Sequence, residues 1–265
     1  MLFNNRRAQS NSDDRQSNMT EMNNVPLLDE IISAHGGAKR WACIQQLKLR
    51  VRVGGNILAL RFESPRTRSL EVTVDTRRVH ISLDPFPRRG MRGVFDGHAV
   101  RIETNDEGKL LTQREVVRSS EGKVVRRIVW DDLDLLYFLG DALWNYAVAP
   151  FVFLWPGFEC LEGEPWQERD GSVWRRLHVT YPPAFPTHSR EQTYYFDEAG
   201  LLRRLDYTAE VFCDLARGAH YCEAHKEFDS LIFPTHRVVF ARRASGHPLR
   251  LLSLMEGWID SVIVK

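Results

Sequence analysis

The sequence is poor in cysteine, and the cysteines it has form no recognisable group. The 265 residues contain four of them, Cys43, Cys160, Cys213 and Cys222. None belongs to a CxxC pair, and their spacing matches no zinc-binding pattern. This usage argues against a zinc site and is typical of a large chain in a reducing compartment.

The motifs of several common enzyme classes are also missing. The segment Arg243-Ala244-Ser245-Gly246 lacks the first glycine of a GxSxG elbow. Two Gly-Lys dipeptides, at 108–109 and 122–123, lack the remaining residues of a P-loop, and no GxGxxG, HExxH or EF-hand pattern occurs. These absences remove most of the case for nucleotide, zinc-protease and calcium functions, and we predict neither a cofactor nor a metal.

Charge of one sign and long apolar runs are scarce as well. The formal net charge is +1, so no global field recruits nucleic acid, and we expect no nucleic-acid partner. The apolar run Tyr146–Phe158 is shorter than the roughly 20 residues that a spanning helix needs, and two prolines interrupt it. We therefore predict no integral membrane segment.

The first 24 residues lack the apolar core of a secretory signal. They are rich in Asn, Ser, Asp and Gln, a composition that predicts a disordered tail over residues 1–24. We expect one ordered, β-barrel-like domain over residues 25–265 and a cytoplasmic location.

Alternating apolar and polar residues dominate the rest of the chain. Apolar residues occupy every second position from Leu47 to Val53, which is typical of a strand with one wet face. A Gly54-Gly55-Asn56 turn follows, and the alternation of Leu58, Leu60 and Phe62 predicts a strand that returns from it. Asp96-Gly97 predicts a two-residue hairpin turn. In the second half we predict strands at 173–181, 188–197, 201–211, 219–228, 232–241 and 249–264.

Two helices are predicted beside these strands. The first begins at Pro26 and ends at Gly36-Gly37, and the second is capped by Asp131 or Asp132 and carries an apolar stripe to Ala147. Because no helices cross between strands, a parallel α/β fold is not expected. The predicted fold class is mainly β: a curved antiparallel sheet, or half-open β-barrel, whose mid-chain helix caps or fills the concavity. That leaves two outcomes, a packed core or a cavity for an apolar ligand.

The segment LLDEIISAHGGAKRWACIQQLKLRVRV, residues 27–53, resembles the opening helix, Gly-Gly break and first strand of the LolA and LolB lipoprotein-carrier superfamily. The meander with an interposed helix is similar too. The resemblance implies a curved antiparallel sheet, a helical lid and an acyl-binding concavity. We expect neither a signal peptide nor a lipidated N-terminal cysteine, and in this the sequence would depart from those carriers. No functional residue is carried over.

A hairpin in the second half supplies candidate catalytic groups. Residues 197–200, Asp-Glu-Ala-Gly, predict a type I turn with a left-handed glycine, and this register puts Glu191 opposite Tyr207. Both would face the apolar side, where burial raises the pKa of a carboxyl group. Glu191 is then a candidate general acid or base with Tyr207 as its orienter, although such a pair is more often a structural hydrogen bond.

The next strand has two alternative inward faces. One presents Tyr221 and His225 to the concavity, and the other presents His220 and Cys222, which would form a thiol–imidazole pair. We favour the first, because Tyr221 can cover a neighbouring aromatic surface. The candidate catalytic set is therefore Glu191, Tyr207, Tyr221 and His225.

Bulky aromatic residues supply a candidate lining for a ligand pocket, although such residues more often pack a core. The predicted ligand-binding residues are Tyr137, Trp144, Phe151, Phe153, Trp155 and Tyr195.

The leading functional hypothesis is an accessory protein that binds a hydrophobic small molecule, such as an acyl or isoprenoid-like compound, in the concavity. The alternative is a cofactor-free acid–base enzyme, a cyclase, isomerase or hydrolase, that uses the same space. A third hypothesis is an interaction module built on the seven arginines of residues 65–92, although solvated outer positions of strands are the favoured explanation for them.

Overall fold

The structure is a computed structural model that describes residues 25–61, 67–116, 130–187, 189–213 and 215–265. The predicted tail, residues 1–24, lies outside the described residues. In chain order the elements are α2 (Pro26–Ala34), α3 (Ala38–Trp41), β1 (Gln46–Gly54), α4 (Asn56–Arg61), β2 (Thr67–Asp75), β3 (Ile81–Asp84), β4 (Met91–Phe95), β5 (Ala99–Thr104), β6 (Leu110–Glu115), α5 (Asp132–Val148), the 3₁₀ helix η1 (Phe151–Leu154), β7 (Glu159–Gln167), β8 (Val173–Thr180), β9 (Glu191–Phe196), β10 (Leu202–Thr208), β11 (Arg217–Phe228), β12 (Leu231–Arg242) and β13 (Pro248–Val264).

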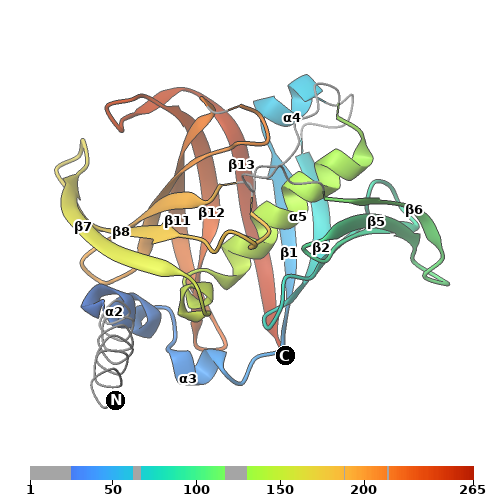
Figure 1. Ribbon diagram of the computed structural model, residues 1–265, viewed down its shortest axis with the longest axis horizontal. Coiled ribbons are helices and arrows are strands. Elements are labelled where there is room, and N and C mark those ends of the chain that lie inside the picture. Colours follow the sequence, from blue (N-terminus) through green and yellow to red (C-terminus); the bar gives the residue numbers. More distant parts are fainter. Residues whose placement is uncertain (1–24, 62–66, 117–129, 188, 214) are drawn as a thin grey trace, which may run out of the picture.

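The described strands form one antiparallel sheet of 13 strands in the order β6-β5-β4-β3-β2-β1-β13-β12-β11-β10-β9-β8-β7. Figure 1 shows the sheet curving, with β7 and β8 at one end, β5 and β6 at the other, and α5 crossing between them. Its edge strands, β6 and β7, are not paired with each other in the described part of the chain. The predicted mainly β, half-open architecture is confirmed.

Strand β1 lies at the centre of the sheet, where the two halves of the chain meet. It pairs with β2 on one side and with β13, from the far end of the chain, on the other. Leu47, Leu49, Val51 and Val53 are buried on the concave side, while Arg50 points outward and is exposed. The alternation therefore located this strand and its buried face correctly.

The strand predicted from Leu58, Leu60 and Phe62 is wrong: residues 56–61 form helix α4, and Phe62 lies outside the described residues. Because β1 is paired on both sides, no edge remains on it for a returning strand. The chain packs α4 against β13 instead, where the Asn56 side-chain amide donates to the Ser253 carbonyl at 2.8 Å and Leu58 is buried.

Strand β7 was not predicted, because its residues carry no apolar alternation. It is an edge strand paired only with β8, and most of its side chains are exposed, Leu161 among them. An edge strand that buries no face gives no period-two signal in the sequence.

The predicted mid-chain helix is confirmed as α5. Asp131 caps it through a reciprocal box, in which its side chain accepts from the Asp134 N–H while the Asp134 side chain accepts from the Asp131 N–H. The helix contacts β3, β4 and β5. Gly93 permits this approach, since a Cβ there would lie 2.5 Å from the Leu136 Cδ1 atom. The predicted N-terminal helix, α2, is confirmed as well, with Pro26 in its first turn.

Candidate functional site

A cavity of about 70 Å³ lies between α5 and the concave face of the sheet. Its apolar lining comes from the floor residues Leu49, Val51, Val53, Val72, Val239, Met255 and Ile259 and from the helix residues Phe138, Leu139, Ala142, Leu143 and Ala147. Met255, Ile259 and Leu143 are only half-buried, which places the mouth of the cavity between α5 and β13. The second predicted outcome, a cavity in the concavity, is therefore present, but it is small.

Polar side chains gather at one part of this cavity. His220 of β11, Arg237 of β12, Tyr207 of β10 and Tyr146 of α5 all line it. Arg237 lies with its Cζ atom 4.8 Å from the centre of the Tyr146 ring, and the His220 ring centre lies 4.7 Å from the same ring. Tyr146 and Tyr207 are near enough to influence each other's pKa, and burial raises the pKa of Tyr207 to about 12. We call these four residues the polar cluster.

Arg237 was missed by the sequence reasoning, although a signal was present. In β12 it shares the parity of the buried residues Leu231, Phe233 and Val239. A charged residue at a position whose side chain points to the apolar face of a strand is expected to be buried. Buried charged groups occur preferentially at functional sites.

The hairpin between β9 and β10 begins as predicted. The Asp197 N–H donates to the Leu201 carbonyl at 3.0 Å, and Gly200 has a φ of 76°, which is the left-handed conformation expected for the glycine of this turn.

The register beyond the turn differs from the prediction by one residue. Arg203 forms a bulge in β10, so that Thr193 pairs with Asp206. A one-residue slip turns every later side chain to the opposite face. The predicted pairing of Glu191 with Tyr207 is therefore wrong: Glu191 is exposed, whereas Tyr207 faces the cavity.

Glu191 lines a different depression, an open groove of about 990 Å³ on the outer side of β8, β9 and β10. The groove is bordered by polar side chains of both signs, including Arg176, Arg190, Asp206 and Arg242. Tyr207 also contributes to the lining of this groove, so the groove brings Glu191 and Tyr207 together, but neither Tyr221 nor His225 lines it.

Strand β11 presents the face that we did not favour. His220 and Cys222 point into the concavity, whereas Tyr221 lies on the outer side of the sheet in a separate buried cluster. His225 lies farther along the strand, where its Nε2 atom is 2.9 Å from the Leu202 carbonyl oxygen. The structure does not bring the four candidate catalytic residues together, and their catalytic role stays a prediction.

The inward pair of His220 and Cys222 does not have the electrostatics of a thiolate–imidazolium pair. Burial raises the pKa of the Cys222 thiol and lowers the pKa of His220 well below its ordinary value. Both groups are therefore neutral, and the thiol sulfur accepts a hydrogen bond from the Arg237 Nη1 at 3.1 Å. A nucleophilic cysteine needs the opposite shifts.

The six predicted ligand-binding aromatics do not line the cavity, and their role stays a prediction. Five belong to the packed interior. Trp144 donates from its Nε1 to the Asp75 carbonyl oxygen at 3.0 Å, and Phe151 stacks on Trp41 at 4.2 Å. The other three interior residues are Tyr137, Phe153 and Trp155. Tyr195 lies on the outer side of the sheet. Helix α5 is buried on most of its circumference, so the sequence did not reveal which of its faces meets the cavity.

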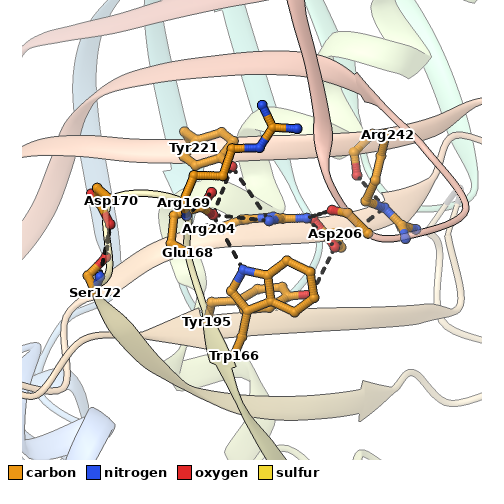
Figure 2. A network of polar contacts seen from close by, with 12 residues as sticks. Trp166, Glu168, Arg169, Asp170, Ser172, Tyr195, Arg204, Asp206, Tyr221 and Arg242 are labelled. Carbon is orange, nitrogen blue, oxygen red and sulfur yellow. Dashed lines mark hydrogen bonds and ion pairs between the residues drawn. The ribbon is translucent and has the colours of Figure 1, made fainter.

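The outer side of β10 carries a buried ionic cluster around Arg204, shown in Figure 2. Arg204 has 0% side-chain exposure and binds Asp206 through two hydrogen bonds of 2.7 and 2.9 Å. Its Nη1 atom lies 3.3 Å from a Glu168 oxygen, and Nη2 also donates to the Gly246 carbonyl. The rings around the guanidinium are Trp166, Tyr195 and Tyr221. The sequence reasoning took Arg204 and Asp206 for wet residues, because β10 alone does not show that the 243–247 turn covers this face.

The arginine-rich segment 65–92 is largely engaged within the molecule. Arg78 pairs with Asp75, Arg92 pairs with Glu103, and Arg68 donates to the Pro87 carbonyl oxygen. Arg88 and Arg89 are exposed in the turn before β4, and Arg66 lies outside the described residues. An interaction role for this segment stays a prediction.

The described residues contain neither a cluster of metal ligands nor a membrane-spanning helix. No three His, Cys, Asp or Glu side chains gather there into a group that could hold a metal ion. Across the same ranges, no helix combines the length and apolarity needed to cross a membrane. All four cysteines are free thiols.

No protein-family model matches the sequence, and neither does any curated protein. Solved structures do match. A DUF1329 family protein from Desulfovibrio piger is 13% identical, with a TM-score of 0.55 over 91% of this chain and 92% of that one. A LolA superfamily protein from Nitrosomonas europaea is 10% identical, with a TM-score of 0.50 over 84% of this chain and 86% of that one. At these identities the likeness concerns the fold alone, and it confirms that this chain has a LolA-like fold.

Proposed function

We propose that this protein binds a hydrophobic small molecule, with an acyl or isoprenoid-like chain, in the cavity between α5 and the concave face of the sheet. The observation that carries the proposal is the lining of this cavity. Its walls are almost entirely aliphatic and aromatic, while its mouth at Met255, Ile259 and Leu143 stays partly uncovered. Partly exposed apolar surface inside a concave fold is typical of a ligand-binding site rather than of a fully packed hydrophobic core.

The size of the cavity sets a condition on binding. A space of about 70 Å³ holds only a handful of water molecules, so a chain-like ligand must widen it. The elements around it permit this, because the contacts of α5 with the sheet are made chiefly with β3, β4 and β5, on one side of the cavity. On the other side Met255 lies at the mouth, and a methionine side chain adapts easily to a new neighbour.

The alternative hypothesis of an acid–base enzyme gains no support from the geometry, because the four candidate catalytic residues are dispersed over two faces of the sheet. The interaction module gains none either, since most of its described arginines have intramolecular partners. A cytoplasmic location remains a prediction.

The test is a titration of the purified protein with the neutral fluorescent probe N-phenyl-1-naphthylamine, together with native mass spectrometry for a co-purifying hydrophobic compound. The Gly257→Leu variant should fill the cavity: Gly257 lines it, and a Cβ there would meet its nearest neighbour, the Arg52 carbonyl oxygen, at an ordinary 3.8 Å. The matched control is Ser261→Leu, which adds an equal side chain to the outer face of the same strand.

We expect wild type and Ser261→Leu to bind the probe equally and Gly257→Leu to bind it at least tenfold more weakly. The proposal is wrong if wild type neither binds the probe nor carries a hydrophobic compound, or if Gly257→Leu binds as wild type does.

A further inference from the structure

Arg237 is a buried cation without a carboxylate partner. Its residue exposure is 7%, and no carboxylate of the described residues forms an ion pair with it. Its guanidinium contacts the Cys222 sulfur, the Tyr146 carbonyl oxygen at 3.3 Å and the face of the Tyr146 ring, while its Nε atom has no hydrogen-bond partner. A guanidinium keeps its charge at any physiological pH, so this arrangement leaves a desolvated positive charge uncompensated.

The same chain shows how a buried arginine is normally accommodated. Arg204, on the opposite face of the sheet, is held by the carboxylates of Asp206 and Glu168. Buried charges are generally paired in this way, because an unpaired one costs several kcal/mol. Arg237 therefore has the surroundings of a buried arginine but lacks the anion.

His220 beside it is also unsatisfied. Its exposure is 1%, and neither Nδ1 nor Nε2 has a hydrogen-bond partner in the described structure. Burial keeps its pKa well below the ordinary value, so the ring is neutral and has one N–H to donate. A neutral donor next to a single cation suits a ligand group that carries one negative charge.

Glu256 borders the cavity, but its side chain does not enter it. In β13 it alternates with Met255 and Gly257 and points to the other face of the sheet, where its Oε1 atom lies 3.0 Å from the Nε2 atom of His236. It does not approach the Arg237 guanidinium within ion-pair distance.

Resting on the proposed function, we propose that the hydrophobic ligand is a single-chain carboxylic acid whose carboxylate is bound by Arg237 and His220, with its chain running over the apolar lining towards β13. A planar carboxylate accepts two parallel hydrogen bonds from a guanidinium. A phosphate monoester carries up to two negative charges and more volume. It fits one cation and a narrow cavity less well.

The experiment compares two probes of equal chain length, dodecanoate and dodecanol, in displacing N-phenyl-1-naphthylamine below their micellar concentrations. We expect dodecanoate to bind wild type at least tenfold more tightly than dodecanol. In Arg237→Met this preference should disappear, so that the affinities for dodecanoate and dodecanol become equal within about twofold. Arg250→Met, at an exposed arginine of β13, is the matched control and should keep the preference.

The proposal is overturned if wild type binds dodecanol as tightly as dodecanoate, a comparison that does not depend on any variant folding. It is also overturned if Arg237→Met weakens both compounds equally. In either case binding of the neutral probe upholds the proposed function, whereas loss of all binding by wild type refutes both. Arg237→Lys, which keeps the charge, should retain part of the preference.

Discussion

Arg204→Met removes the central cation from the buried cluster on the outer face of the sheet. In the wild type its side chain is fully buried, with two hydrogen bonds to Asp206 and an ion pair to Glu168. The substitution keeps most of the side-chain volume but leaves two carboxylates, with side-chain exposures of 5% and 4%, without their principal cation.

The expected loss is large because the remaining charges cannot return to water without opening the cluster. Breaking a buried ion pair from one side costs about 3–5 kcal/mol. That is a large share of a domain stability of roughly 5–15 kcal/mol. Replacing Asp206 as well, in Arg204→Met/Asp206→Leu, removes one uncompensated carboxylate and should recover at least half of the loss.

Urea unfolding followed by tryptophan fluorescence measures the free energy of unfolding, provided that the slope of the transition is unchanged. The control is Arg50→Met, which breaks an exposed ion pair with Glu71 and should change stability by less than about 1 kcal/mol. Our account of the cluster is refuted if Arg204→Met is as stable as this control, or if the double variant is no more stable than the single one.

Two further predictions concern the ends of the helices. His35 caps α2, its Nδ1 lies 2.7 Å from the Ile31 carbonyl oxygen, and burial lowers its pKa from 6.5 to about 4. Protons therefore bind the unfolded state first. Wild type should lose about 3 kcal/mol of unfolding free energy as the pH falls from about 7.5 to 4, with almost none lost above that range. Urea titrations across that range should show this loss diminished in His35→Gln, and identical pH profiles would contradict it. Asp131→Ala removes the α5 capping box and should lower the unfolding free energy by about 1–2 kcal/mol. Asp132→Ala, one residue inside the helix, is the control, and equal losses in the two variants would count against the cap.

The sequence predicted most strands because their signal is local. Leu47 to Val53 alternate as predicted, and a turn that includes Asp96 and Gly97 joins β4 to β5. The predicted register of that turn is wrong, because Phe95 pairs with Val100 and the Asp96 N–H donates to the Ala99 carbonyl. The failures arose where a second element changes the outcome. Residues 56–61 cannot pair with β1, because β13 already occupies that side.

The composition of the candidate site depends on the pairing register of the strands and on which elements pack over the sheet. Neither can be deduced from the sequence of one strand. One bulge at Arg203 sends Glu191 to solvent and leaves Tyr207 inside. The inward face of β11 proved to be that of His220, although both faces offered aromatic or titratable residues. Arg237 could have been predicted from the sequence, because it alternates in step with Leu231, Phe233 and Val239, which are apolar and buried.

Local sequence patterns were enough to predict an antiparallel sheet with an N-terminal helix and a mid-chain helix, because period-two alternation, turn glycines and helix caps act over a few neighbouring residues. The short helices α3 and α4 and the set of side chains that share the cavity became known from the three-dimensional structure. That set of side chains depends on a bulge, on how α5 is turned above the sheet, and on long-range pairing that brings β13 beside β1. These are set by the packing of segments far apart in the chain, and no local pattern records them.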